Sequence, residues 1–122
     1  MEEQTPKKRV KGRPKGHGYE RDLMHKFIGL GWTRCKTARS ESRNRDNLKI
    51  DLCYTDPFNV QAKAVESLGP LHNVLAEMPK EEGQFNVVYH KKNRKGTVVA
   101  MSEEDFVRMV NMLIAAGSIT PA

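Results

Sequence analysis

The chain has 122 residues, which is enough for one domain with a single core but too few for two such domains. It contains no run of about 18 apolar residues and no apolar N-terminal signal segment, so we expect a soluble cytoplasmic protein without a membrane span, in the host cytoplasm if viral. The net charge of +6 is concentrated in residues 1–50, which hold 14 Lys or Arg and 6 Asp or Glu, whereas residues 51–122 hold 7 and 9. Such asymmetry is typical of proteins that bind phosphate backbones, and an ordinary charged surface is the alternative.

The first 17 residues are rich in Lys, Gly and Pro, and Val10 is their one apolar residue after Met1. This composition predicts a disordered basic tail over residues 1–17, followed by a single domain over residues 18–122. The stretch KGRPKG contains the Gly-Arg-Pro triplet of an AT-hook, which makes Arg13 and Lys15 candidate DNA contacts. We favour a nonspecific phosphate tether as the role of this segment.

A first helix is predicted from Gly18 to about residue 30, because Leu23, Phe27 and their neighbours form one apolar stripe. Glu20 lies almost two full turns before Phe27 and therefore shares that stripe. A buried acid is costly without a partner. The sequence leaves open whether Glu20 has one or is an exposed first-turn acid that the helix dipole favours.

Three strands are predicted next, over residues 31–39, 48–54 and 58–64, with a polar Arg- and Ser-rich loop after the first and a turn after the second. Cys35 and Cys53 lie inside these strands without zinc-site spacing, so we expect buried thiols. A short helix follows between Pro70 and Pro79, and then two strands enclose the basic turn KKNRKG. The predicted order is therefore αβββαββα once the last helix is included.

The last helix is predicted to begin at Ser102, where Asp105 completes a sequence that resembles a capping box. Its apolar stripe contains Met109 and Leu113. This stripe either caps the sheet or mediates dimerisation, and the pattern does not choose between them.

A constellation of polar residues interrupts the second and third strands. If these strands form a hairpin, Asp51 lies across from Gln61, and Lys63 lies one step further on the same face. A carboxylate, an amide oxygen and an ammonium group are compatible with a Mg²⁺ site beside a phosphate. Glu20 would complete it if the first helix packs there. The alternative is a polar outer face of an ordinary hairpin.

These residues, with Glu20 on a leading helix, Asp51 on a strand and the QAK triplet at Gln61 to Lys63, resemble the PD-(D/E)XK nuclease superfamily. Within it the chain is most similar to small Holliday-junction-resolvase-type members, including phage-encoded ones. The resemblance implies an α/β (α+β) restriction-endonuclease-like core, with a central mixed sheet flanked by helices. It also implies Mg²⁺-dependent hydrolysis of DNA phosphodiester bonds, with Mn²⁺ as a substitute, commonly by a homodimer acting on branched or four-way DNA.

By the same resemblance Glu20, Asp51 and Gln61 are metal ligands and Lys63 is the catalytic lysine. The serine that resolvase-type members place after the first strand corresponds to Ser40 or, as an alternative, Ser42. The chain departs from the motif at Ile50, where the motif name has Pro, and at Gln61, where it has a second acid. An amide adds no negative charge, so Glu20 or Asp46 would have to compensate.

The remaining basic residues are candidate phosphate contacts on either side of the cut. They comprise Arg39, Arg43 and Arg45 in the loop after the first strand, and Lys91, Lys92, Arg94 and Lys95 at the later hairpin turn. The leading hypothesis is thus a metal-dependent endonuclease. A catalytically inactive nucleic-acid-binding protein on the same scaffold is the alternative, and a small interaction protein whose tail binds an acidic partner is the third.

Overall fold

A computed structural model of the chain describes the backbone of residues 4–122 and the side chains of residues 16–122. It contains a mixed sheet of three strands flanked by helices, which confirms the predicted mixed α/β class. The elements are α1 (Gln4–Leu30), β1 (Lys36–Thr37), α2 (Ala38–Glu41), α3 (Arg43–Asn47), β2 (Leu52–Cys53), β3 (Phe58–Lys63), α4 (Leu71–Ala76), β4 (Phe85–Lys92), β5 (Gly96–Ala100) and α5 (Glu103–Ala115). Apart from the two short helices α2 and α3, this order is the predicted one.

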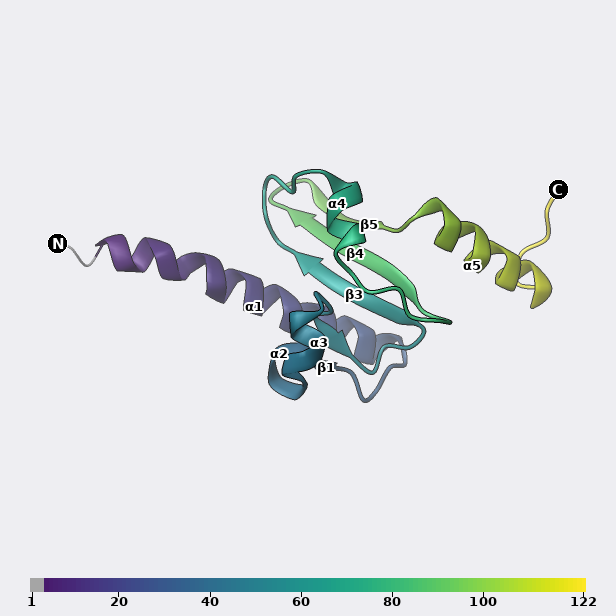
Figure 1. The fold of residues 1–122 in the computed structure, drawn as a ribbon, viewed down its shortest axis with the longest axis horizontal. Coiled ribbons are helices and arrows are strands. Elements are labelled where there is room, and N and C mark those ends of the chain that lie inside the picture. The colour runs from purple at the N-terminus through teal and green to yellow at the C-terminus, as the bar shows by residue number, and fades with distance from the viewer. Residues whose placement is uncertain (1–3) are drawn as a thin grey trace.

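The central sheet has the strand order β3-β4-β5 (Figure 1). β3 runs parallel to β4, and the segment containing α4 makes the crossover between them, whereas β5 returns antiparallel to β4 through a tight turn. The β3–β4 register places Gln61 beside Val88 and Lys63 beside His90. Side chains alternate across a strand, so Gln61 and Lys63 share one face of β3 and Val60 lies on the other.

The core has one layer on each face of this sheet. On one face, Leu23 and Phe27 of α1 pack against Val60 and Val87, because their spacing of one helical turn forms a continuous apolar stripe. On the other face, Val74 and Met78 of the α4 segment pack with Ile50 and Val88. The sheet therefore fixes α1, and with it Glu20, relative to β3.

The first helix is longer than the apolar pattern indicates. It begins at Gln4 and so includes most of the segment predicted as a tail. Lys and Arg, which are frequent in residues 4–15, have good helix propensity. Residues 1–3 and the side chains of Arg13 and Lys15 lie outside the described part of the chain.

The segment predicted as one strand and a polar loop is largely helical. β1 contains only Lys36 and Thr37, and the chain then forms α2 and α3 in succession. Ser42 explains the second of these turns, since its hydroxyl accepts a hydrogen bond of 3.3 Å from the Arg45 backbone N–H and caps α3. The prediction of an irregular loop missed this cap.

The predicted hairpin between the second and third strands is also wrong in its pairing. β2 pairs with β1 in a separate two-stranded sheet, and β3 pairs with β4. Asp51 joins the two sheets: its N–H donates to the Val60 carbonyl at 2.7 Å, and its carboxylate accepts from the Ala62 N–H at 2.7 Å. Because a side chain takes the place of a backbone carbonyl there, no ladder continues between β2 and β3.

α5 begins as predicted, with the Ser102 hydroxyl accepting a hydrogen bond of 3.1 Å from the Asp105 N–H. It then extends away from the sheet (Figure 1), and none of its residues is buried. Within the described residues, no helix has the length and apolar character needed to cross a bilayer.

Candidate metal and phosphate site

Two acids from distant parts of the chain meet beside the edge of β3. Glu20 comes from α1 and Asp51 from the residue before β2, and the charge of Asp51 raises the pKa of Glu20. Packing of α1 on β3 brings Glu20 to this place, and the two hydrogen bonds of Asp51 fix the second acid. The structure thus brings together the two carboxylates that the sequence suggested.

Glu20 is an acid in an unfavourable environment. Burial, with repulsion by Asp51 and Asp46, raises its pKa from 4.5 to about 7, although Arg39 opposes the shift. Arg39 Nε lies 3.5 Å from Glu20 Oε1, and the Glu20 side chain is only 14 % exposed. Glu20 Oε1 is buried and has no hydrogen-bond donor among the described residues. A single partly exposed arginine therefore leaves this carboxylate incompletely compensated.

Asp51 is held more tightly than Glu20. Burial raises the pKa of Asp51, the hydrogen bond from the Ala62 N–H lowers it, and repulsion by Asp46 raises it. The positive charges of Lys63 and Lys49 also lower it, so both lysines lie near this carboxylate. No hydrogen bond or ion pair between Asp51 and Lys63 is present among the described residues, so Lys63 acts on Asp51 through its charge alone.

Gln61 lies at the predicted point of β3 but is deeply buried. It is 2 % exposed, and neither its amide oxygen nor its amide nitrogen has a hydrogen-bond partner among the described residues. An unpaired buried amide costs about 1–3 kcal/mol. Its strand neighbour Val88 belongs to the cluster under α4, whereas Glu20 comes from the helix on the other face. Asp51 is tied to β3 by its hydrogen bonds to Val60 and Ala62, the residues on either side of Gln61.

The two candidate serines have other partners. Ser40 Oγ lies 2.9 Å from Thr37 Oγ1 and donates to the Thr37 carbonyl at 3.1 Å, which fixes the turn at the start of α2. Ser42 caps α3. Ser40 follows Arg39, the partner of Glu20, directly in sequence, and the contacts of its hydroxyl are those of the local turn.

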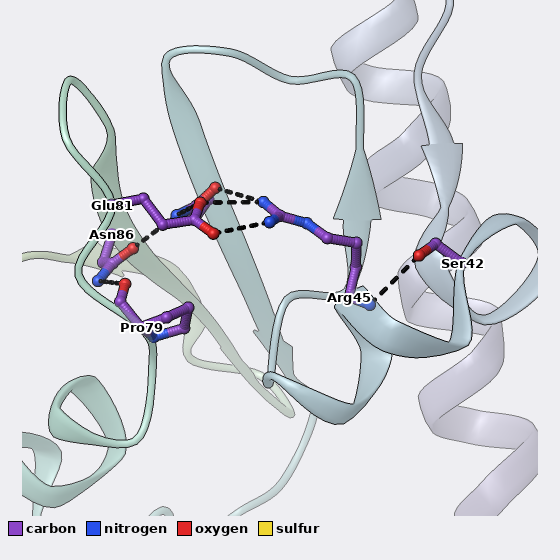
Figure 2. A network of polar contacts seen from close by, with 6 residues as sticks. Ser42, Arg45, Pro79, Glu81 and Asn86 are labelled. Carbon is purple, nitrogen blue, oxygen red and sulfur yellow. Dashed lines mark hydrogen bonds and ion pairs between the residues drawn. The ribbon is translucent and has the colours of Figure 1, made fainter.

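Arg45 is engaged in a structural network instead of being a free cation. Its guanidinium binds both carboxylate oxygens of Glu81, at 2.8 and 3.2 Å, and also donates to Asn59 Oδ1 at 3.1 Å (Figure 2). Asn59 donates in turn to Glu81 and to Asn86, each at 3.1 Å, and Asn86 donates to the Pro79 carbonyl at 3.0 Å. The network joins α3 to the segment before β4, so Arg45 was misinterpreted as a phosphate contact.

The basic turn between β4 and β5 lies close to the candidate site. Lys91 Nζ lies 5.7 Å from the ring centroid of Tyr19, the residue that precedes Glu20 on α1. The predicted phosphate contacts Lys91, Lys92, Arg94 and Lys95 are all exposed, as are Arg39 and Arg43 on the other side. Arg39 thus brings positive charge to Glu20, and Lys91 brings it to the neighbouring Tyr19.

The residues fit a hard cation in part. Glu20 and Asp51 supply two carboxylates, and the amide oxygen of Gln61 is a chemically suitable third ligand, while Mg²⁺ needs only one or two carboxylates when phosphate and water complete its coordination. Among residues 16–122, however, no three His, Cys, Asp or Glu side chains are arranged as a metal-binding group.

Sequence reasoning missed Lys49 and Glu81. Lys49 lies two residues before Asp51 and adopts a left-handed backbone conformation with φ 67°. This conformation is uncommon for a residue other than glycine, and no sequence signal marks it here. Glu81 has a weak signal in Asn59, a polar residue in an otherwise apolar strand that required a buried partner.

No family model, no curated protein and no solved structure matches this chain.

Proposed function

We propose that the protein is a Mg²⁺-dependent endodeoxyribonuclease with a restriction-endonuclease-like core, which hydrolyses phosphodiester bonds in branched DNA such as a four-way junction. The observation that carries the proposal is the approach of Glu20 and Asp51, from elements far apart in sequence, in a partly desolvated place where the charge of Asp51 disfavours that of Glu20. A divalent cation would offset that repulsion.

Each residue near the acids has a role in this proposal. Glu20 and Asp51 would hold Mg²⁺, for which Mn²⁺ would substitute. The amide oxygen of Gln61, which lies on the opposite face of β3 from α1, would join them only after a change of side-chain position. The metal would supply charge neutralisation for the phosphate and activation of water. Lys63, whose charge already acts on Asp51, would stabilise the negative charge that develops on the phosphate oxygens.

Binding of DNA is supported by the charge distribution around the acids. The exposed lysines of the β4–β5 turn and the basic first part of α1 would contact phosphates on one side, and Arg39 and Arg43 on the other. A second copy of the chain, as the family resemblance implies, would provide a second site for the opposite strand of a junction.

The test is cleavage of linear, flapped and four-way DNA with and without Mg²⁺ or Mn²⁺. Asp51→Asn is preferable to alanine because an amide oxygen still accepts the Ala62 N–H, so the junction of the two sheets is retained. We expect Asp51→Asn and Lys63→Met to abolish cleavage, and Lys80→Met, an exposed lysine outside the candidate site, to leave it unchanged. Unchanged cleavage by both site variants would refute the assignment.

A second readout separates metal binding from chemistry. Mg²⁺ should raise the melting temperature of the parent chain and not that of Asp51→Asn, because a ligand that binds only the folded state stabilises it. Salt-dependent DNA binding that is indifferent to Mg²⁺ and to Asp51 would instead identify a catalytically inactive nucleic-acid-binding protein.

A further inference from the structure

α5 presents its polar side to its own domain and its apolar side to solvent. Asp105 accepts a hydrogen bond of 3.2 Å from the Asn86 N–H. Arg108, one turn later, donates to the Gln84 carbonyl at 2.9 Å and lies 4.0 Å from the ring centroid of Phe85. At 100° per residue these anchors point away from Phe106, Val110 and Leu113.

The outward side of α5 is correspondingly apolar. Phe106 is 52 % exposed and Val107 is 47 % exposed, and three further apolar residues of the helix are more than one-third exposed, namely Met112, Leu113 and Ile114. We call this surface, formed by Phe106, Val107, Val110, Leu113 and Ile114, the α5 stripe. A surface helix of a monomer normally has the opposite orientation, with its apolar stripe against the core.

The strand that leads into α5 is also uncovered. β5 ends the described sheet, and its five residues, GTVVA, include no charged residue and no proline. Val98 is 60 % and Val99 53 % exposed. Edge strands of monomers are usually protected by charges, proline or a covering element, so β5, which leads into α5, is a second uncovered apolar segment.

Two parts project from the body, the first part of α1 and α5 (Figure 1). The first is basic in sequence and suits a polyanion, whereas α5 exposes apolar side chains. An apolar surface is what the core of a homodimer interface buries.

The charges on α5 favour a second copy of the same helix as the occupant. Its acids, Glu103, Glu104 and Asp105, lie in the first turn, and no charged residue follows Arg108. Two α5 helices packed antiparallel would keep their acidic turns at opposite ends and bring the uncharged halves together. A membrane surface fits poorly, since interfacial helices carry Lys and Arg on their polar side.

We propose that the α5 stripe, together with the edge of β5, is the contact surface of a homodimer with two-fold symmetry. The inference does not depend on the nuclease proposal, because it uses none of the residues around Glu20 and Asp51. Its test is the mass of the full chain in solution, a measurement that does not depend on cleavage activity.

Sedimentation or light scattering at micromolar concentration should give twice 13.9 kDa for the parent chain. Replacing Phe106 and Leu113 together by Glu should give a monomer, with dissociation at least a hundredfold easier, because two central apolar anchors are lost. The matched control replaces Leu30 and Val65 by Glu and should remain dimeric. These two residues are 70 % and 41 % exposed and lie outside the proposed contact surface. Circular dichroism checks that all variants are folded.

A cross-link decides the case in which the double variant fails to fold. Val110→Cys, near the middle of α5, should form an intermolecular disulfide, whereas Leu30→Cys, which lies outside the proposed contact, should not. The native Cys35 and Cys53 are buried and should not compete. A monomeric parent chain, a dimer that survives both Glu substitutions, or a Val110→Cys variant that does not cross-link would overturn the proposal. A monomer that binds lipid vesicles through the stripe would assign that surface to a membrane instead.

Discussion

Replacement of Glu20 by Gln should stabilise the protein at neutral and alkaline pH. Burial, together with repulsion from Asp51, raises the pKa of Glu20 from 4.5 to about 7. In the unfolded chain the acid ionises near 4.5, so between these two values the folded state holds a proton that the unfolded state has lost. The free energy of unfolding therefore falls as pH rises through this interval.

The size of the effect follows from the pKa difference. At 1.36 kcal/mol per pKa unit, a carboxylate with a folded pKa near 7 costs about 3 kcal/mol at pH 8 relative to its neutral form. Gln resembles that neutral form and carries no such cost. For a domain of this size the difference is a melting-temperature increase on the order of 10 °C.

The assay is thermal or urea unfolding of Glu20→Gln and the parent chain at a series of pH values from 4 to 8. The two proteins should have similar stability near pH 4 and diverge as pH rises through the interval between the two pKa values. Glu77→Gln is the matched control, because Glu77 is exposed and should give a profile parallel to the parent's. Parallel profiles for Glu20→Gln as well would refute the buried, uncompensated carboxylate.

Three further predictions concern separate parts of the molecule. Gln61→Leu should raise the free energy of unfolding, measured in urea, by about 1–3 kcal/mol, because the unpaired amide is costly to the fold. It should also abolish cleavage, because only the proposed site would use the amide. A loss of stability would contradict this prediction. Arg45→Met should lower the free energy of unfolding by about 1–3 kcal/mol, because Glu81 and Asn59 lose a charged donor, yet leave the salt dependence of DNA binding unchanged. Replacing Lys91 and Lys92 by Gln should do the reverse, reducing the slope of log affinity against log salt by about 2 without changing stability; equal slopes would exclude the β4–β5 turn from the DNA surface.

The sequence predicts the larger elements because their apolar spacing is regular. The stripe of Leu23 and Phe27 predicts the packed half of α1, and Ser102 with Asp105 predicts the start of α5, as the structure has them. The segment around Ser42 is different. Its residues have no apolar period, and its helical turns depend on a cap and on Arg45 binding Glu81, a partner far along the chain.

The construction of the candidate site was not predictable from the sequence. Alternation was expected to bring Asp51 across from Gln61 in a hairpin ladder, whereas Asp51 meets β3 through hydrogen bonds to Val60 and Ala62. Alternation cannot indicate that a carboxylate will replace a backbone carbonyl at the junction of two sheets. For the same reason it could not show that Arg45, which lies in a basic cluster, would be occupied by Glu81.

The double use of Asp51 has a consequence for how this chain tolerates random change. Its carboxylate both joins the two sheets through Ala62 and supplies charge beside Lys63, so most substitutions there would remove folded protein together with any activity. Lys63 contributes only to the second of these. In a library of single variants sorted for abundance, position 51 should therefore be depleted and position 63 tolerated, and drift toward an inactive protein would begin at the lysine.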